Sequence, residues 1–353
     1  MKDGKLGFGI IGCGVIAPTH RKAIEACAEA EVVAVCDIDE EKGKAFAEES
    51  GGAQFYRDYA EILAADDVDV ACICTPSGLH ADCVIAAAKA GKHAFCEKPL
   101  DIDRGRMTAM IAACREAGVK LGCVFQSRTS PDMIKARKTI MAGELGPMVL
   151  GDALLKNYRS QAYYNSAGWR GTWALDGGGA LMNQGVHGID LLLWLMNDDV
   201  ESVFARCDHL VRDIEVEDTC VAALKFKGGA FGTIIGTTSC NPGEARRCEL
   251  HGKHGTICVN GTKLSRWAVT SEDDGRATEV EPPEEIDGSG GTVGDNKAVT
   301  AEGHVFLIDD MVKAIKEDRD PYIIGESARK AVDLILAIYE SSRTGQDVPV
   351  TSS

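Results

Sequence analysis

Two short stretches of the chain carry residue types that could move a proton from a hydroxyl group. Lys98 lies between Glu97 and Pro99, directly after an apolar run. Asn183 and His187 are four positions apart in a helical pattern, so they share one face about one turn apart. A neutral imidazole can accept a proton near neutral pH. A lysine can hold an oxygen that is becoming negative.

The strand before Lys98 is expected to place it at a ligand site. Phe95 and Cys96 are predicted to end an inner strand, and Pro99 disfavours helical backbone at Lys98. Ligands bind at the carboxyl ends of strands in open α/β sheets. The alternative for an isolated lysine is a surface position at the start of a loop.

A helix is predicted over the glycine-preceded run that contains Asn183 and His187. Its buried face is predicted from residues at helical spacing, which are Met182, Val186, Ile189, Leu193 and Met196. Asp190 follows His187 by three positions and is expected within reach of the imidazole ring. A purely structural histidine is the alternative.

The chain opens with a strand, a glycine turn and a helix, which is the pattern of a dinucleotide site. Residues 6–11 are apolar and β-prone, and Gly-x-Gly-x-x-Ala follows. The first glycine permits the tight turn, and the second lets the backbone approach a pyrophosphate at the helix N-terminus. The loop residues expected at the cofactor are Gly12, Gly14, Val15 and Ile16.

Asp37 ends the second predicted strand, 23 residues after Gly14, where a carboxylate can bind the adenosine ribose hydroxyls. The sequence Asp37-Ile38-Asp39 has no adjacent arginine for a 2′-phosphate, so NAD is favoured over NADP. A helix N-cap is the structural alternative for Asp37 and does not exclude the ribose contact.

The strand predicted over residues 68–74 ends at the same edge. Thr75, Pro76 and Ser77 follow it, and His80 opens the next helix. These four residues are expected near the cofactor together with Glu97 and Lys98. For His80, a histidine that merely begins a helix is an equal alternative.

The length of 353 residues favours two domains. Strands and helices alternate over residues 1–125, which predicts an α/β domain with a doubly wound parallel (Rossmann) sheet. Over residues 126–353, strand-like runs separated by hairpin turns predict an α+β domain on a mostly antiparallel sheet. The predicted strands there are residues 148–157, 200–210, 219–226, 230–239 and 249–259. Residues 271–297 are expected to form an exposed acidic loop, followed by helices over 301–317 and 326–342.

Composition excludes several classes of protein. The net charge of −16 argues against nucleic acid or an anionic membrane as partner. The 14 cysteines include no Cys-x-x-Cys pair, so free buried thiols are favoured over disulfides or a metal site. No metal role is expected for His251 or His254. No signal segment is recognised, which favours a cytoplasmic protein.

Together, the glycine loop, Glu97-Lys98-Pro99 and the run Gly-Gly-Gly-x-Leu-x-Asn-x-Gly-x-His-x-x-Asp resemble the Gfo/Idh/MocA family (glucose–fructose oxidoreductase, inositol dehydrogenase, MocA). The resemblance implies a Rossmann domain followed by a domain on a large, mostly antiparallel sheet. It implies NAD or NADP, sugar or cyclitol substrates, and dimers or tetramers. It makes Lys98 the active-site lysine and His187 the proton acceptor. Many members have aspartate where this chain has Asn183. An asparagine can bind a sugar hydroxyl but cannot take a proton, so base catalysis must rest on His187 or on Lys98 itself.

The resemblance also suggests substrate contacts. Gln126 and Arg128 follow the last Rossmann strand, where relatives contact substrate or cofactor. Aromatic and polar residues suited to a sugar pocket precede the glycine run, notably Tyr158, Trp169 and Arg170. For Trp169 and Arg170, ordinary packing is an equal alternative.

Three functions are compatible with these residues. The first is NAD-dependent oxidation of a secondary hydroxyl on a sugar, cyclitol or glycoside. The second is a redox-neutral reaction, either glycoside cleavage or epimerisation, in which the cofactor stays bound. The third is a non-catalytic NAD-binding regulator, against which the presence of both Lys98 and His187 argues.

Overall fold

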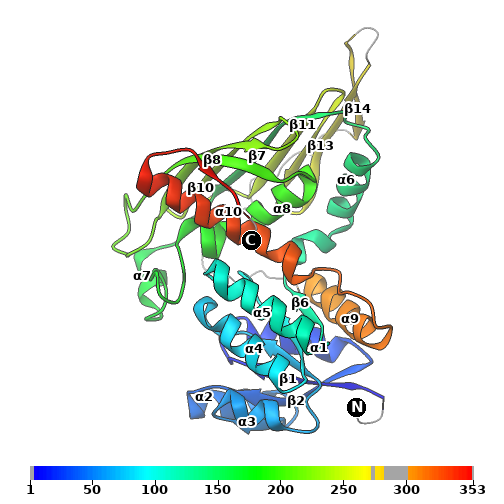
Figure 1. The fold of residues 1–353 in the computed structure, drawn as a ribbon, viewed down its shortest axis with the longest axis vertical. Helices are drawn as coiled ribbons and strands as arrows, with labels where there is room; N and C mark the ends of the chain where they lie inside the picture. The colour runs from blue at the N-terminus through cyan, green and yellow to red at the C-terminus, as the bar shows by residue number, and fades with distance from the viewer. Residues whose placement is uncertain (1–3, 272–274, 282–300, 352–353) are drawn as a thin grey trace. The chain divides into compact units, whose positions relative to one another are not determined.

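The computed structural model describes residues 4–271, 275–281 and 301–351, and the chain forms two compact units (Figure 1). The first unit comprises Met1–Gln126 and Val299–Arg329, and the second comprises Ser127–Ala298 and Lys330–Ser352. The sequence pattern assigned everything after residue 125 to the second domain. Helix α9 (Glu302–Lys316) instead belongs to the first unit, because it packs against α1 (Ala17–Ala26).

A parallel sheet of six strands, counted over the described residues, forms the centre of the first unit in the order β3-β2-β1-β4-β5-β6. The strands are β1 (Leu6–Ile11), β2 (Ala30–Cys36), β3 (Gln54–Tyr56), β4 (Val70–Ile73), β5 (His93–Cys96) and β6 (Leu121–Cys123). The other helical segments of this unit are α2 (Glu40–Glu49), α3 (Tyr59–Ala64), η1 (Ser77–Leu79), α4 (His80–Lys89) and α5 (Arg104–Glu116). The predicted Rossmann fold is confirmed.

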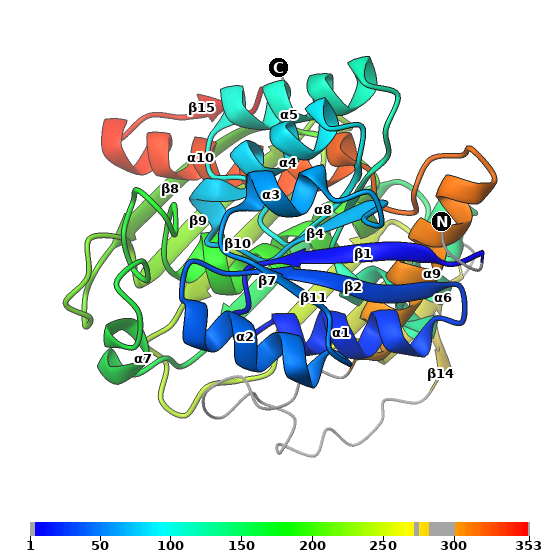
Figure 2. The ribbon, with the colours of Figure 1, turned by 90° about the horizontal axis from the view of Figure 1, so that it is seen from below.

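Helices cover both faces of this sheet. Figure 2 shows α1 and α2 on one side of β1 and β2, and α3, α4 and α5 on the other. Strands that are covered twice need apolar residues throughout, and all six residues of β1 are buried. The strand order reverses between β1 and β4, which is the point where such sheets bind ligands.

The second unit contains a nine-stranded sheet, again counted over the described residues, in the order β14-β13-β12-β11-β7-β10-β9-β8-β15. Only β7 and β10 are parallel neighbours among these strands. The strands are β7 (Met148–Lys156), β8 (Val200–Asp208), β9 (Thr219–Phe226), β10 (Phe231–Thr237), β11 (Arg247–Gly252), β12 (Gly255–Asn260), β13 (Lys263–Thr270), β14 (Ala277–Glu281) and β15 (Val348–Pro349). The mostly antiparallel sheet confirms the predicted class.

Two predicted segments of this sheet are wrong in detail. The single strand expected over residues 249–259 is a hairpin of β11 and β12, because the chain reverses at Lys253 and His254. The acidic loop expected over residues 271–297 contains β14, which pairs with β13. The remainder of that loop, apart from residues 271 and 275–276, lies outside the described residues.

The helical segments of the second unit are η2 (Gln126–Thr129, beginning at the unit boundary), α6 (Pro131–Met141), α7 (Gln161–Asn165), η3 (Ala180–Gly185), α8 (Val186–Met196) and most of α10 (Gly325–Thr344). The helix predicted around His187 begins with a π-helical turn, η3, before it becomes α8. Four of the five residues of its predicted apolar face are buried, and Leu193 is half-buried. α8 packs on β7 and β11. Among the described residues, none of the helices has the length and apolar character needed to cross a bilayer.

Candidate active site

The strand ends of the first unit bring the predicted cofactor residues to one edge of the sheet. Ile11 pairs with Cys36 on one side and with Ile73 on the other. Ile73 in turn pairs with Cys96. The residues that follow these four strand ends therefore share the carboxyl edge, and they are Gly12, Asp37, Thr75, Pro76, Ser77, Glu97 and Lys98.

The glycine loop leaves room for a bound dinucleotide. Gly12 has a φ of +95°, and a Cβ there would lie 2.8 Å from the Cys74 carbonyl carbon. A Cβ on Gly14 would meet nothing within 4 Å. Helix α1 begins without a side-chain cap at Ile16, as expected where phosphate oxygens bind the N-terminus. The apolar side chains of Val15 and Ile38 are 73% and 84% exposed beside this loop, which suits contact with the cofactor rings.

Asp37 supports the loop and leads into α2. Its Oδ2 accepts from the Cys13 N–H at 2.8 Å and lies 3.0 Å from Lys42 Nζ. Its Oδ1 accepts from the Asp39 N–H at 2.9 Å. The N-cap of α2 is Asp39, so the alternative that Asp37 caps this helix is wrong. Asp37 retains lone pairs for ribose hydroxyls, and the residues at this edge fit NAD.

His80 connects two of the loops at the cofactor edge. Its ring is 1% exposed, with Nδ1 2.8 Å from the Pro99 carbonyl oxygen and Nε2 3.0 Å from the Thr75 carbonyl oxygen. The peptide bond between Lys98 and Pro99 is cis. Both partners are carbonyl oxygens, so only a ring nitrogen that carries a proton can donate to its partner, and the neutral ring holds either the chain after β4 or the chain after β5.

Glu97 is buried beneath Lys98 and paired with histidines. Its Oε1 lies 2.7 Å from His20 Nε2 and 3.6 Å from His304 Nε2, and its Oε2 accepts from the Lys98 N–H at 3.0 Å. Burial would raise the pKa of Glu97, but the two imidazoles hold it well below its ordinary value. Burial lowers the pKa of His20, yet Cys72 and Glu97 outweigh it and raise that pKa to about 10. The backbone at Lys98 is therefore anchored by an ion pair.

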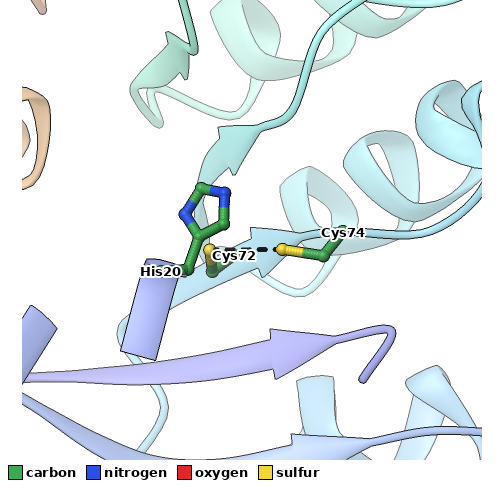
Figure 3. A group of neighbouring side chains, drawn as sticks. All are labelled: His20, Cys72 and Cys74. Carbon is green, nitrogen blue, oxygen red and sulfur yellow. Dashed lines mark hydrogen bonds between the residues drawn. The ribbon is translucent and has the colours of Figure 1, made fainter. Parts of the chain in front are cut away.

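Cys72 and Cys74 lie beside the same histidine (Figure 3). The ligand atoms of His20, Cys72 and Cys74 lie within 4.8 Å of one another, as do those of His20, Glu97 and His304. Two ligands of one tetrahedral zinc ion stand about 3.4 Å apart by the usual bond lengths. The 2.7 Å between His20 and Glu97 is instead the length of a hydrogen bond.

In the second unit, η3 and α8 present a narrow accessible strip. From Ala180 to Asp190 the side chains are buried except at Asn183, Gln184 and His187, which are half-buried. The expected shared face of Asn183 and His187 is consistent with this pattern. π-helical turns occur frequently at functional sites.

A network of hydrogen bonds orients Asn183. Asp176, which is 1% exposed, accepts from Asn183 Nδ2 at 2.6 Å. Asn183 Oδ1 accepts from Gln184 Nε2 at 3.0 Å, and Gln184 also donates to the Tyr163 hydroxyl at 2.9 Å. These partners fix which amide atom faces which way. A carboxylate thus stands beside Asn183 although position 183 itself is not an aspartate.

Of the predicted aromatic and basic residues, Arg170 joins the same network through Tyr163, and Trp169 packs on Arg170. The Arg170 guanidinium stacks on the rings of Tyr163 and Trp169, at 4.3 and 4.7 Å from their centroids, and donates to the Tyr163 hydroxyl. Arg159 donates to Gln184 Oε1 at 2.8 Å. Tyr158 pairs through its backbone with Ser239 and is half-buried. Trp169 and Arg170 are also half-buried.

A second carboxylate, Glu217, binds the start of η3. Its Oε2 accepts from the Gly179 N–H at 2.9 Å, and its Oε1 accepts from the Leu181 N–H at 2.8 Å and the Tyr339 hydroxyl at 2.9 Å. A Cβ on Gly179 would lie 1.9 Å from the Glu217 carbonyl oxygen, so only glycine fits there. Burial raises the pKa of Glu217 to about 7 despite these hydrogen bonds.

Arg128 and Asp190 form a buried ion pair. Arg128 Nε donates to Asp190 Oδ2 at 2.8 Å, and Nη2 donates to Oδ1. Asp190 was expected near His187 as an orienting carboxylate, whereas the structure engages both of its oxygens with Arg128. Burial still raises the pKa of Asp190. Gln126, at the start of η2, is half-buried.

Sequence reasoning missed several residues of these arrangements, namely His20, Asp176, Gln184, Glu217 and His304. Only Asp176 carries a signal in the sequence, because it directly precedes the glycine run that leads to Asn183. Glu217 contacts η3 from 36 residues away, and His304 meets Glu97 across more than 200 residues. Pattern analysis of neighbouring residues has no access to such pairs.

Comparison with known proteins gives matches over both units. Residues 6–125 match the model "Oxidoreductase family, NAD-binding Rossmann fold", and residues 133–258 match the GFO/IDH/MocA C-terminal domain. The WlbA dehydrogenase from Bordetella pertussis, solved in complex with NADH and UDP-GlcNAcA, is 34% identical. That match covers 98% of this chain and 99% of the other with a TM-score of 0.85.

Two further relatives have different substrates in their names. Myo-inositol 2-dehydrogenase of Thermotoga maritima is 29% identical over 77% of this chain and 80% of its own length. Aldose-aldose oxidoreductase from Caulobacter crescentus, solved with glycerol, is 27% identical with a TM-score of 0.79. The match covers 98% of this chain and 99% of that structure.

Proposed function

Because this chain belongs to the Gfo/Idh/MocA oxidoreductases, with their NAD-binding Rossmann domain, we propose that it oxidises a secondary hydroxyl of a sugar, cyclitol or glycoside. The observation that carries the proposal is the strip of Asn183, Gln184 and His187, three polar groups left accessible on a segment, Ala180 to Asp190, whose other side chains are buried. Amide and imidazole groups bind hydroxyls, and the named relatives act on or bind polyhydroxylated compounds.

We assign proton removal to His187. Asn183 has no basic atom, and its amide is oriented by Asp176 and Gln184 to bind a hydroxyl. An imidazole with a pKa of about 6.5 can take the hydroxyl proton at neutral pH. Asp176 remains a hydrogen-bond acceptor that fixes the amide.

We assign stabilisation of the developing alkoxide to Lys98. The Lys98 N–H donates to the Glu97 carboxylate, which is itself paired with His20. The lysine side chain is therefore attached to a fixed strand end. A preorganised cationic donor of this kind contributes about 3 kcal/mol to the transition state. The glycine loop, Asp37, Thr75, Pro76, Ser77 and His80 would hold or support the cofactor. Bound NAD supplies the hydride acceptor.

A redox-neutral reaction is the second candidate, since one relative is named an aldose-aldose oxidoreductase. In such a reaction the same Lys98 and His187 would act on successive hydroxyl and carbonyl groups. Net NADH would not accumulate, which separates the two candidates.

We also propose that the chain forms a homodimer or homotetramer. Phe204, Val221 and Phe231 expose large apolar side chains on β8, β9 and β10. Burying such a group of side chains against a second copy is favourable. Size-exclusion chromatography with light scattering would give a monomer mass if this is wrong.

The test of the function is a substrate panel followed at 340 nm. Purified protein is mixed with excess NAD and cyclitols, aldoses, nucleotide sugars or glycosides. NADH formation with one class, lost in Lys98→Ala, supports the dehydrogenase. A Lys89→Ala variant, at an exposed position of the same unit, is the matched control. Turnover of substrate without free NADH would replace the first candidate by the second, and NAD binding with no turnover by any compound would contradict both.

A further inference from the structure

Cys207 and Cys220 face each other across two neighbouring strands of the second unit. In the register of β8 with β9, Cys207 stands directly opposite Cys220. Their Sγ atoms are 2.8 Å apart, in hydrogen-bond contact. By comparison, the Sγ atoms of Cys72 and Cys74 are 3.9 Å apart. The cross-strand pair is thus the closer of these two thiol contacts.

The backbone around Cys207 defines the type of pairing. Its N–H donates to Ser342 Oγ at 2.7 Å, and the Ser342 hydroxyl donates to its carbonyl oxygen at 3.3 Å. Both main-chain groups therefore point towards α10 and away from β9. Opposed residues at such non-hydrogen-bonded positions have Cα atoms about 4.5 Å apart. A disulfide spans Cα separations of about 4.4–6.8 Å, and the separation typical of this pairing lies within that range.

The two thiols differ in access to solvent. Cys207 is half-buried and Cys220 is fully buried. Of the 14 cysteines, only Cys240 and Cys258 share the exposure class of Cys207. Contact with Cys207 and burial both raise the pKa of the Cys220 thiol. Cys207 is therefore the thiol that meets a dissolved oxidant first.

We propose that Cys207 and Cys220 form an oxidation site that closes to a cross-strand disulfide when the protein meets a hydroperoxide. The Cys207 sulfur attacks the peroxide oxygen, which leaves a sulfenic acid and one molecule of water. The Cys220 sulfur then attacks Cys207 Sγ, loses its proton, and releases a second water. Two thiols are oxidised, and hydrogen peroxide is reduced to two waters.

The site is distinct from the groups assigned to catalysis. β8 and β9 are neighbouring strands of the large sheet. The Ser342 hydroxyl, in the last turn of α10, accepts a hydrogen bond from the Cys207 N–H. Glu217, which binds η3, lies three residues before Cys220 on the same segment of chain. A disulfide here would link β8 to β9 close to the contact between Glu217 and η3, and it would not modify Lys98 or His187.

The test uses the full chain after complete reduction, exposed to stoichiometric hydrogen peroxide and then blocked with an alkylating agent. Denatured samples should lose two of the 14 reactive thiols. Peptide mapping should find the Cys207 and Cys220 peptides joined, with two hydrogen atoms fewer than their sum. This measurement on the unmodified sequence does not depend on any variant folding.

Variants give the order of events. Cys220→Ser should leave a Cys207 sulfenic acid that dimedone traps, and Cys207→Ser should leave Cys220 reduced at the same dose. The matched control is Cys258→Ser, at another half-buried cysteine, which should still lose two thiols. The proposal is overturned if Cys207 and Cys220 both still react with the alkylating agent after exposure to peroxide while other thiols have been oxidised. A Cys72–Cys74 link in place of the cross-strand link would overturn it equally.

Discussion

The Asp176 carboxylate accepts a hydrogen bond of 2.6 Å from the Asn183 side-chain amide, within a buried turn that leads to His187. The amide donates in one direction and accepts from Gln184 in the other. Asn183 therefore supplies the donor that the Asp176 carboxylate accepts from. An aspartate at position 183, as in many members of the family, would place two carboxylates in contact.

We expect Asn183→Asp to lower the free energy of unfolding by about 1–3 kcal/mol at pH 7, because a donor is replaced by a like charge. The exchanged pair, Asp176→Asn with Asn183→Asp, should recover most of that loss. Urea unfolding of both single variants and the double variant gives the coupling energy. Additive losses would show that the two side chains do not interact.

Glu217 should give an unusual pH dependence of stability. Its pKa is about 7 in the folded protein, above the ordinary 4.5. The folded state therefore binds this proton more tightly than the unfolded state does, so the stabilising contribution is complete below about pH 4.5 and is lost as pH rises through 7. The loss is on the order of 3 kcal/mol.

Glu217→Gln should remove that decline, although one backbone donor loses its acceptor. Unfolding is measured between pH 5 and 8 for the unmodified protein, Glu217→Gln and Tyr339→Phe. The Tyr339 variant removes one hydrogen bond to the carboxylate but retains its titration. An unchanged slope in Glu217→Gln would contradict the assignment.

The His20 and Glu97 pair should keep its charge over a wide pH range. The pKa of His20 is raised to about 10, so its stabilising contribution is complete below about pH 6.5 and is lost as pH rises towards 10. Nitrogen NMR of labelled histidine should find His20 doubly protonated at pH 8. Glu97→Gln should lower the His20 pKa, because the carboxylate is removed. His209, with an exposed side chain, serves as the internal reference. A neutral His20 ring at pH 8 would disprove the ion pair.

His187 should set the acidic limb of the activity profile. If it accepts the hydroxyl proton, kcat/KM falls at acidic pH, where the imidazole is protonated. His187→Gln should lose about 10²–10⁴-fold in kcat and abolish that limb. The control is His209→Gln, which should retain both the rate and the profile. If the acidic limb persists in His187→Gln, another group is the base.

Asp37→Ala should weaken NAD binding by about ten- to a hundredfold, since charge-assisted hydrogen bonds contribute about 1.5–3 kcal/mol each. Titration calorimetry gives the Kd directly. Asp39→Ala is a matched control two residues away. It removes the N-cap of α2, costs about 1 kcal/mol of stability, and should leave the Kd unchanged. If the two variants changed the Kd equally, Asp37 would not contact NAD directly.

Local patterns predicted the elements near the cofactor well. β1 was predicted with its observed bounds, and the turn at Gly12 follows from the need for a positive φ. Short repeats of apolar residues determine such strands, because burial on both faces requires them. The residues around Asn183 were predicted on the correct helix, but its opening π-helical turn was not.

The rest depends on contacts between distant parts of the chain. Nothing near Glu217 in the sequence indicates that it binds the backbone of Gly179 and Leu181. Asp190 was expected beside His187 from its spacing, and burial with Arg128 gave it a different partner. Strand β14 was hidden in an acidic segment, since pairing with β13 and not apolar character places it in the sheet.

Helix α9 has a consequence for how the protein is made. It follows most of the second unit in the sequence, yet it packs on α1 and brings His304 to Glu97. β6 likewise obtains a partner late, since the Cys123 N–H donates to the Ile323 carbonyl oxygen. At a ribosomal rate of about 5–20 residues per second, about ten to thirty-five seconds separate Gln126 from α9. During that interval all six strands of the nascent Rossmann sheet are present, but β6 lacks its contact with Ile323 and the Glu97 carboxylate lacks one of its two imidazoles. Synthesis of α9, and not synthesis of the first 126 residues, is therefore the point at which a finished nucleotide-binding unit first exists.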